Sequence, residues 1–314
     1  MPKDFYARTT ILTDMRSKKI ELKEIIDFLG EEIIGISGDF TGKWIDNMAD
    51  ASHITTTSLD WINPSKPDKQ AIAAGSRAKV LITDCSIASV PGKVLIKVKA
   101  PKRAIAMVGN RFFADRPTPG IHSTAVIHSE AVIGENVAIG PYSVIGKARI
   151  GEGTIIASRV RIHDDVVIGR NCSVKDGAVI GGEGFGFETD EKGNRFRFPQ
   201  IGGVVIGDHV EIGANTCIDR GALSDTIVED YSKIDNLCHI AHNVVLGKNT
   251  VVVSGAVLCG SSRIGESSWI GPNAVVRDQI SIGRNVILGM GAVAAKNVKD
   301  DDVRVGNPSK SLIY

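Results

Sequence analysis

The sequence predicts a mainly β protein, in which a parallel β-helix follows a small α/β domain. Two features of its composition and one of its pattern carry this prediction. Glycine is frequent, at 34 of 314 residues, while aromatic residues make up only 5% of the chain. From Ile121 onward, aliphatic residues recur every six positions, and the preceding part of the chain lacks this period.

An aliphatic residue opens each six-residue unit, as in "IGENVA" and "IGPYSV". A period of six differs from the 3.6-residue period of a helix and from the alternation of a single strand, but it suits short strands joined by tight turns, with three units to a triangular coil. The aliphatic side chains would point into the coil, while Gly, Asn and Asp accept the turn dihedrals. The opening residues form runs separated by changes of register: Ile121, Ile127, Ile133, Ile139 and Ile145; Ile150, Ile156, Ile162, Ile168, Val174 and Ile180; Ile206, Ile212 and Ile218; then Val228, Ile234, Ile240 and onward to Leu288.

Before the repeat, the pattern is that of alternating helices and strands. The segment "KKIELKEIIDFLGEEIIG" predicts a short amphipathic helix that ends at Gly30. The segments "KVLITD" (79–84) and "KVLIKVK" (93–99) predict strands, and Pro101 is typical of the start of a helix in "PKRAIAMVGNRFF". The apolar face of the first helix would consist of Leu22, Ile25, Ile26, Phe28 and Leu29.

These patterns divide the chain into four parts. We expect a small α/β domain over residues 1–114, a proline-rich linker "DRPTPG" over 115–120, the β-helix over 121–302 and a short tail over 303–314. The β-helix would carry an inserted loop over 181–203.

Charge and hydropathy exclude several kinds of partner. The 37 Lys and Arg residues nearly balance the 36 Asp and Glu residues, so the chain has no excess basic field to hold a nucleic acid. The N-terminal "MPKDFYARTTILTDM" has no long apolar segment, and no run of about 18 apolar residues occurs elsewhere. We therefore expect a cytoplasmic protein without an integral membrane segment.

The cysteines and histidines do not predict a metal site. Five widely spaced cysteines without a CxxC pair are typical of free thiols, and Cys172 and Cys238 fall at the fifth position of their units, where small side chains also face the core. The seven histidines do not cluster beyond His239 and His242, so a carbonic-anhydrase-like zinc enzyme is not expected. The remaining cysteines are Cys85, Cys217 and Cys259.

Two interruptions of the repeat point to a site. The first is "GGEGFGFETDEKGNRFRFPQIGG" (181–203), in which Phe185 and Phe187 either present flat rings to a ligand or only anchor the loop to the coil. The second is "CIDRGALSDT" (217–226), which shifts the register just before "KIDNLCHIAHNV".

The segment "IAHNVV" carries the candidate catalytic base. If Ile240 and Val244 point inward, His242 projects outward near a coil edge, where an imidazole can accept a proton near neutral pH. Asp235, one unit earlier, is a candidate to hold the tautomer of the ring. His239 is interpreted as an edge residue.

The run from "GFGF" to "LGKNT" resembles the UDP-3-O-acylglucosamine N-acyltransferases of lipid A biosynthesis, within the hexapeptide-repeat acyltransferase superfamily. The resemblance implies a left-handed parallel β-helix and a homotrimer with active sites between neighbouring helices. It also implies a 3-hydroxyacyl thioester of acyl carrier protein as donor, a UDP-sugar acceptor and no bound cofactor. In this family the histidine of "IAHN" is the base, here His242, the aspartate of "IDN" is its partner, here Asp235, and a glycine amide stabilises the oxyanion, here Gly260.

The resemblance also suggests substrate-binding residues. Trp61 and Asn63 in "LDWINPSK" match an aromatic residue and an "NP" motif that grip uridine. The remaining candidates for substrate contact are Phe185, Phe187, Asn236 and Gln279, the last at a position where a second active-site histidine is common.

Three interpretations remain open at this point. Lys66 follows "NP" where a second aromatic residue is expected, and the ending "VRVGNPSKSLIY" resembles the short tails of sugar acetyltransferases that use acetyl-coenzyme A. The chain is thus either an acyl-carrier-protein-dependent N-acyltransferase or an acetyl-coenzyme A-dependent N-acetyltransferase of another nucleotide-linked amino sugar. A non-catalytic trimeric scaffold is the third possibility.

Overall fold

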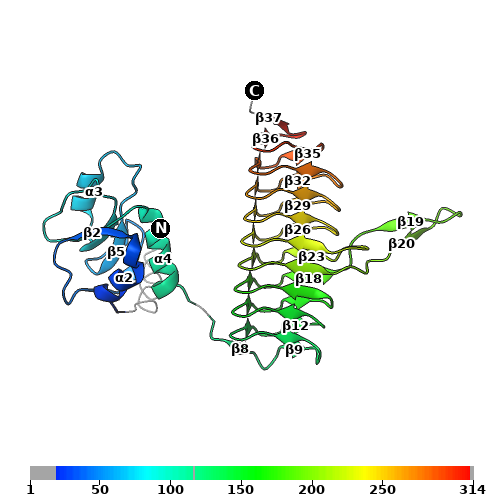
Figure 1. Ribbon diagram of the computed structural model, residues 1–314, viewed down its shortest axis with the longest axis horizontal. Coiled ribbons are helices and arrows are strands. Elements are labelled where there is room, and N and C mark those ends of the chain that lie inside the picture. Colours follow the sequence, from blue (N-terminus) through cyan, green and yellow to red (C-terminus); the bar gives the residue numbers. More distant parts are fainter. Residues whose placement is uncertain (1–18, 116, 312–314) are drawn as a thin grey trace, which may run out of the picture. The chain divides into compact units, whose positions relative to one another are not determined.

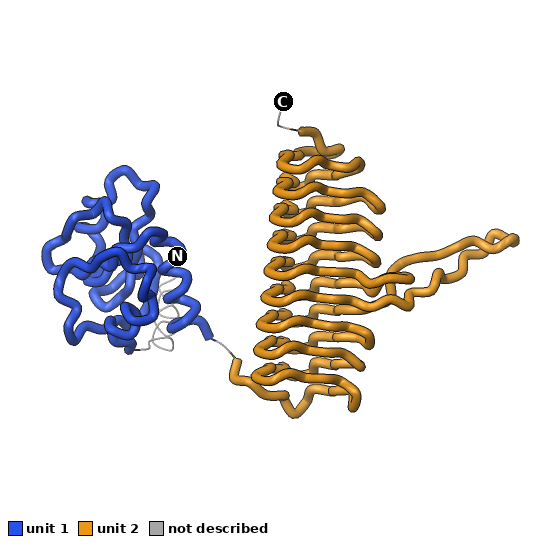
Figure 2. The backbone as a smooth tube through the Cα atoms, viewed as in Figure 1, with its two compact units in different colours: residues 1–116 blue, residues 117–314 orange. Residues whose placement is uncertain are grey.

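A computed structural model describes residues 19–115 and 117–311 of the chain. They belong to two compact units, residues 1–116 and 117–314 (Figure 2). The first unit mixes helices and strands, and the second is a parallel β-helix. The predicted fold class is therefore confirmed.

The first unit contains a five-stranded sheet with the order β2-β7-β6-β5-β4, in which only β2 and β7 are antiparallel. The helices α2 and α4 cover one face of this sheet, because Ile25 and Ala104 pack with Val80 and Ile82. The helix α3 packs on the other face, against Leu81. The bounds are β1 Ile20–Glu21, α2 Leu22–Leu29, β2 Ile33–Ser37, β3 Trp44–Ile45, β4 Asn47–Met48, β5 Ser58–Trp61, α3 Lys69–Gly75, β6 Val80–Thr83, β7 Val94–Val98 and α4 Pro101–Val108.

The predicted helix and strand signals of this unit are confirmed. Helix α2 ends at Gly30, which has a φ of 42°, and Pro101 occupies the first turn of α4. After Val108 the chain continues as a π-helical turn, η2 (Gly109–Phe113), so the helix changes its hydrogen bonding before the end of the predicted segment. A 3-10 turn, η1 (Gly30–Glu32), follows α2.

In the second unit, short strands stack into three parallel faces, which we number in chain order (Figure 1). The first face comprises β8 Gly120–Ile121, β11 Ala138–Ile139, β14 Ile155–Ile156, β17 Ser173–Val174, β22 Glu211–Ile212, β25 Lys233–Ile234, β28 Val251–Val252, β31 Trp269–Ile270, β34 Ile287–Leu288, β36 Val303–Val305 and β37 Lys310–Ser311. The second comprises β9 Val126–Ile127, β12 Val144–Ile145, β15 Arg161–Ile162, β18 Val179–Gly182, β23 Cys217–Asp219, β26 His239–Ile240, β29 Val257–Leu258, β32 Val275–Val276 and β35 Val293–Ala294. The third comprises β10 Val132–Ile133, β13 Arg149–Ile150, β16 Val166–Ile168, β21 Val204–Ile206, β24 Thr226–Val228, β27 Val245–Leu246, β30 Arg263–Ile264 and β33 Ser281–Ile282.

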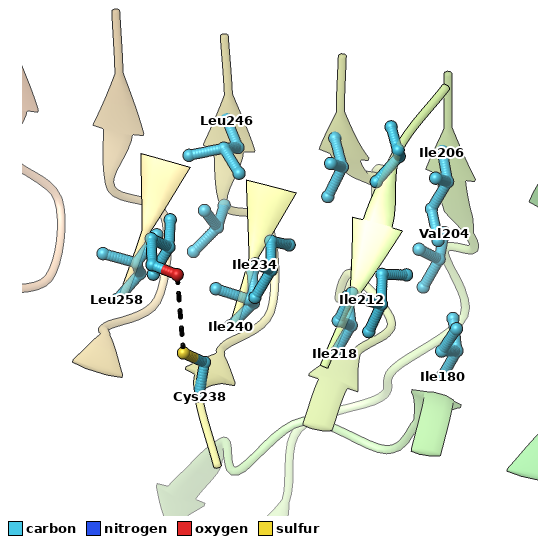
Figure 3. Packing of buried hydrophobic residues seen from close by; sticks show 14 of the residues in the cluster. Ile180, Val204, Ile206, Ile212, Ile218, Ile234, Cys238, Ile240, Leu246 and Leu258 are labelled. Carbon is cyan, nitrogen blue, oxygen red and sulfur yellow. Dashed lines mark hydrogen bonds between the residues drawn. The ribbon is translucent and has the colours of Figure 1, made fainter. Parts of the chain in front are cut away.

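The aliphatic residues that open the units form the core of the coil, as Figure 3 shows for its middle turns. Ile218 pairs with Ile240 and Ile240 pairs with Leu258, so equivalent side chains stack from one turn to the next. Cys172 and Cys238 are 1% and 2% exposed, which confirms that they fill the core. Burial raises the pKa of both thiols, because a thiolate is poorly solvated there.

The corners between faces contain residues with positive φ. Asn residues, which tolerate this conformation, occupy many of these positions, as the sequence predicts. Leu237 (φ 58°) and Gln279 (φ 60°) also adopt it, although their side chains are poorly suited to the left-handed region.

Both interruptions of the repeat leave the coil between the second and third faces. The insertion forms a hairpin of two antiparallel strands, β19 (Phe187–Thr189) and β20 (Arg195–Arg197), which projects from the side of the coil (Figures 1 and 2). The second interruption, residues 220–225, joins β23 to β24 one turn later. At the C-terminal end, β36 and β37 pair antiparallel.

Position in the stack should decide how much each aliphatic residue contributes to stability. Ile240 is completely buried, whereas Ile121 in the first turn is 51% exposed. We expect Ile240→Ala to lower the free energy of unfolding by about 2–5 kcal/mol and Ile121→Ala to lower it by about 1 kcal/mol or less. Urea unfolding followed by circular dichroism checks this, and equal losses in the two variants would contradict the stacking of Ile240 in a closed core.

Candidate active site

His242 lies where the chain turns from β26 to β27, at the corner between the second and third faces, which we call the second corner. Ile240 and Val244 on either side of it are fully buried in the coil. The imidazole is half-buried and points away from the core, in the orientation that the hexad pattern predicts.

Asn243 contacts the imidazole directly. Its Oδ1 lies 3.1 Å from Nδ1 of His242 and also accepts a hydrogen bond of 3.0 Å from the backbone N–H of Ala222. An amide oxygen only accepts hydrogen bonds, so Nδ1 carries a proton and Nε2 keeps its lone pair. The ring is thereby in the form that takes up a proton at Nε2.

Two glycines enclose the ring. A Cβ added to Gly260 would lie 2.7 Å from both Cε1 and Nε2 of His242, and a Cβ added to Gly184 would lie 2.7 Å from Cβ of His242 and 3.2 Å from its Cδ2. Gly260 occupies the second corner one turn after His242, and Gly184 comes from the base of the hairpin insertion. Any larger residue at either position would displace the imidazole or the backbone.

The backbone N–H of Gly260 is available to a ligand. Elsewhere, side chains of the following turn cap such amides; Asp164 Oδ1, for example, accepts a hydrogen bond of 2.8 Å from the N–H of Lys147. Over residues 19–115 and 117–311, no acceptor bonds the N–H of Gly260. Gly260 itself packs against Nε2 of His242, so a backbone donor without an acceptor and a candidate base belong to neighbouring residues of one corner, as in oxyanion sites.

Asp219, at the end of β23, lies in the turn before His242 and next to His239. Its Oδ2 lies 3.7 Å from Nε2 of His239, and its side chain is only 14% exposed. Burial raises the pKa of Asp219, while the neighbouring His239 and His242 lower it.

The expected pairing of Asp235 with His242 is wrong within one chain. Asp235 and Asn236 lie at the first corner, between the first and second faces, whereas His242 lies at the opposite end of β26. Asp235 accepts hydrogen bonds from the backbone N–H groups of Asn236 (2.7 Å) and Ser254 (3.2 Å). Because one unit spans a whole side of the coil, residues one unit apart belong to different corners.

The side chain of Asn236 takes part in the hydrogen bonding of its own corner. Its Oδ1 accepts a hydrogen bond of 2.7 Å from the N–H of Ala214 in the preceding turn. It lines a shallow groove of about 450 Å³ on the outer side of the first face, together with Lys233, Asp235 and the partly exposed Trp269. The structure therefore does not bring Asn236 to His242 in the same chain.

Gln279 lies at the second corner, one turn beyond Gly260. Its N–H donates a hydrogen bond of 3.0 Å to the carbonyl of Gly260, and its Nε2 donates to Asp278 at 3.3 Å. Gln279 thus lies at the same corner of the coil as His242, two turns further along. Its hydrogen bond helps to orient the peptide group between Gly260 and Ser261.

The phenylalanines of the insertion differ in their contacts. Phe185 is 81% exposed and meets the edge of Phe187, with 4.9 Å between the ring centroids. The guanidinium of Arg197 lies 5.1 Å from the centre of the Phe187 ring, and its Nη1 donates to the carbonyl of Gly184 at 3.1 Å. Phe187 and Arg197 therefore help to hold Gly184 beside His242, while Phe185 is open to a ligand or a partner.

A groove of about 550 Å³ begins beside Asn243 and follows the outer side of the third face. Polar and apolar side chains line it in similar measure, including Asp225, Ser261 and the 66% exposed Leu223. This size is typical of small-molecule sites. We call it the Leu223 groove; its lining includes Phe198, Leu223, Ile227, Asn243, Val245 and Arg263.

In the first unit, Trp61 and Asn63 have different surroundings. Trp61 is half-buried and lines an open cavity of about 530 Å³ with Met48, Leu59 and Ile105. Asn63 is exposed and is not among the residues that line it, and its Oδ1 accepts a hydrogen bond of 3.0 Å from the N–H of Ser65. Only Trp61 is thus placed to stack on a ligand in this cavity.

Two features are absent from the described part of the chain. Residues 19–115 and 117–311 contain no group of three or more His, Cys, Asp or Glu side chains that could hold a metal ion. None of the helices in those residues is long and apolar enough to cross a bilayer.

Several residues of this site were not predicted. Asp219 and Gly184 come beside His242 only through the register of the coil and the fold of the insertion, which local patterns do not give. Asn243 directly follows the predicted base and has a short polar side chain at a turn, so the sequence did contain a signal for it. Gln200, at the other end of the hairpin, is buried, and its Oε1 has no donor among the described residues.

Comparison with known proteins agrees with the repeat. The family model described as bacterial transferase hexapeptide (six repeats) matches residues 147–182, 225–260 and 261–296. The second of these segments includes both His242 and Gly260. Repeats of this type fit a left-handed parallel β-helix.

Curated relatives match part of the chain. A probable UDP-3-O-acylglucosamine N-acyltransferase 2, mitochondrial, from Arabidopsis thaliana is 45% identical over 120 residues, which is 38% of this chain and 40% of that protein. The UDP-3-O-acylglucosamine N-acyltransferase from Delftia acidovorans is 44% identical over 126 residues, which is 40% of this chain and 37% of that protein. The match thus spans about two fifths of the length of these relatives.

Solved structures support the fold. The UDP-N-acetylglucosamine acyltransferase from Francisella novicida is 28% identical with a TM-score of 0.56, over 61% of this chain and 68% of that one. The enzyme of the same name from Campylobacter jejuni is 26% identical with a TM-score of 0.55, over 61% and 73%. Together with the coil and its corner histidine, these matches confirm the predicted resemblance: the chain is a left-handed parallel β-helix of bacterial transferase hexapeptide repeats, similar to the UDP-3-O-acylglucosamine N-acyltransferases.

Proposed function

We propose that this protein is an acyltransferase of lipid A biosynthesis that moves a 3-hydroxyacyl group from acyl carrier protein to the 2-amine of UDP-3-O-acylglucosamine. One observation carries the proposal. His242, with Nδ1 held by Asn243, has its Nε2 edge against Gly260, whose N–H is free to bind an oxyanion. The relatives named above carry the same substrate in their names.

The proposed reaction is a direct transfer in a ternary complex. The amine nitrogen attacks the thioester carbon, and Nε2 of His242 accepts the proton that the amine loses. The carbonyl oxygen becomes negatively charged and accepts a hydrogen bond from the N–H of Gly260. When the C–S bond breaks, the thiolate leaves with the proton from His242, and the products are the amide and the free thiol.

The neighbours of His242 support this cycle. Asn243 Oδ1 lies 3.1 Å from Nδ1 of His242, so a neutral ring that donates from Nδ1 presents the lone pair of Nε2 to the amine. Asp219, which lies 3.7 Å from His239 in the adjacent turn, is the candidate carboxylate to offset the charge of an imidazolium at this corner. The Leu223 groove, which begins at Asn243, has a mixed lining, in which Leu223, Ile227 and Val245 are the candidates to contact an acyl chain.

Other parts of the chain would bind the rest of the substrates. Trp61, in its open cavity, is the candidate to stack on uracil. We further propose a cytoplasmic homotrimer. The outer side of the second face supports association, because six of its nine strands begin with an accessible valine: Val126, Val144, Val179, Val257, Val275 and Val293.

The testing experiment is a transfer assay with purified protein and UDP-3-O-acylglucosamine. One arm offers 3-hydroxyacyl carrier protein and the other offers acetyl-coenzyme A, and mass spectrometry detects the amide. We expect amide only with the carrier protein. Amide only with acetyl-coenzyme A would make the chain a nucleotide-sugar acetyltransferase, and amide with neither donor would overturn this choice of acceptor.

A further inference from the structure

The second interruption of the repeat, residues 220–225, packs against Asn243. The backbone of this loop bonds both ends of the Asn243 amide: the N–H of Ala222 donates to Oδ1 at 3.0 Å, and the carbonyl of Ser224 accepts from Nδ2 at 2.7 Å. The hydroxyl of Ser224 lies 3.0 Å from Nδ2 as well. The Asn243 side chain therefore closes the loop onto the corner that holds His242.

These contacts determine which end of the amide is the oxygen. A backbone N–H only donates and a carbonyl only accepts, so the end beside Ala222 must be Oδ1 and the end beside Ser224 must be Nδ2. The atom that faces Nδ1 of His242 is the same Oδ1. An amide turned the other way would place a donor against a donor and an acceptor against an acceptor.

The loop itself is shaped around this contact. A Cβ on Gly221 would lie 1.6 Å from the Ser224 carbonyl oxygen and 2.8 Å from Nδ2 of Asn243, so the loop can close on Asn243 only with glycine there. Thr226 Oγ1 accepts a hydrogen bond of 2.8 Å from the N–H of Asn243. Asp225 Oδ1 accepts one of 2.7 Å from the N–H of Gly203, which ties the loop to the end of the insertion.

We propose that residues 220–225 clamp the Asn243 amide in one orientation and thereby fix the Nδ1-protonated tautomer of His242. Asn243 is then a positioning residue, which acts through His242 without touching the substrate. The clamp gives a function to the second interruption, which the reaction itself does not use. This inference rests on the proposed function for its effect on catalysis, but the tautomer can be measured without any substrate.

The test compares Asn243→Ala and Asn243→Asp with the unchanged protein, using ¹⁵N chemical shifts of the histidine ring nitrogens above the pH at which the ring protonates. The signal of His242 is assigned by its loss in His242→Ala. We expect the Nδ1-protonated form in the unchanged protein. We expect the same form in Asn243→Asp, which keeps an acceptor, and a shift toward the Nε2-protonated form in Asn243→Ala.

The kinetic readout should separate positioning from binding. We expect Asn243→Ala to reduce kcat about 10-fold to 100-fold while KM changes less than about twofold, and Asn243→Asp to recover most of kcat. The matched control is Asn249→Ala, since Asn249 has a similar backbone conformation (φ 58° against 60°) at another corner and its side-chain amide makes one long hydrogen bond, to Ser267 at 3.4 Å. It should leave both kcat and the His242 signal unchanged.

Two results would overturn the clamp. One is an Nδ1-protonated His242 that persists in Asn243→Ala, and the other is an unchanged protein whose His242 is protonated at Nε2. If Asn243→Ala does not fold, the Nδ1-protonated form in Asn243→Asp supports the proposal and its absence overturns it. A protein that shows the expected tautomers but transfers no acyl group would refute the proposed function and leave the clamp standing.

Discussion

Replacing His242 with alanine is expected to reduce kcat for N-acyl transfer about 10²-fold to 10⁴-fold, the usual contribution of a positioned general base. The amine must lose a proton as it attacks the thioester, and within the described residues His242 is the imidazole whose Nε2 lies beside the Gly260 amide. KM should change little, because the proton is transferred only as the amine attacks. Steady-state kinetics with varied donor and acceptor measure both parameters.

The fold should tolerate this change. His242 is half-buried and points away from the core, so its loss opens no cavity among the stacked aliphatic residues. The matched control is His209→Ala, which removes another imidazole from a corner of the coil, one that stacks on Tyr231 at 4.7 Å. Full activity in His242→Ala, or an equal loss in His209→Ala, would show that His242 is not the base.

The sequence predicted the coil well because its core follows one rule. An aliphatic residue at every sixth position must be buried, and this requirement also determines that Cys238 lies inside and that His242 lies outside. Ile121 obeys the same pattern but is half-exposed, because it belongs to the first turn and no further turn covers it. Along the whole coil, the hexad pattern therefore predicts which side chains point inward. It predicts their burial only in turns that have a further turn on either side.

The neighbours of His242 were harder to predict. Asp235 is close to His242 in sequence but lies at another corner, whereas Asp219 is distant in sequence and lies in the adjacent turn. Two residues stack in adjacent turns only if the chain between them has the right length. That length depends on how many residues each interruption contains, and the six-residue period does not predict this number. The contact with Gly184 depends further on the path of the hairpin insertion back to the coil.

Substituting Gly260 with alanine is expected to reduce kcat about 10²-fold without unfolding the coil. The added Cβ would lie 2.7 Å from Cε1 and Nε2 of His242, which is too close for any ordinary contact. Because those atoms are the free end of a side chain, the ring would move and the backbone would stay in place. A displacement of about 1 Å at a reacting group is enough for a loss of this size.

Thermal unfolding and a second glycine separate this effect from a loss of structure. Gly182→Ala is the matched control, since its Cβ would meet only Val179, at an ordinary distance of 3.8 Å. Both variants should keep their Tm within about 2–4 °C of the unchanged protein, which corresponds to roughly 1 kcal/mol. If Gly260→Ala retains full kcat, the imidazole does not act from the position it has against Gly260. If the Tm of Gly260→Ala falls far below that of Gly182→Ala, Gly260 is needed for the coil itself. The loss of kcat would then not support the Gly260 amide as an oxyanion donor.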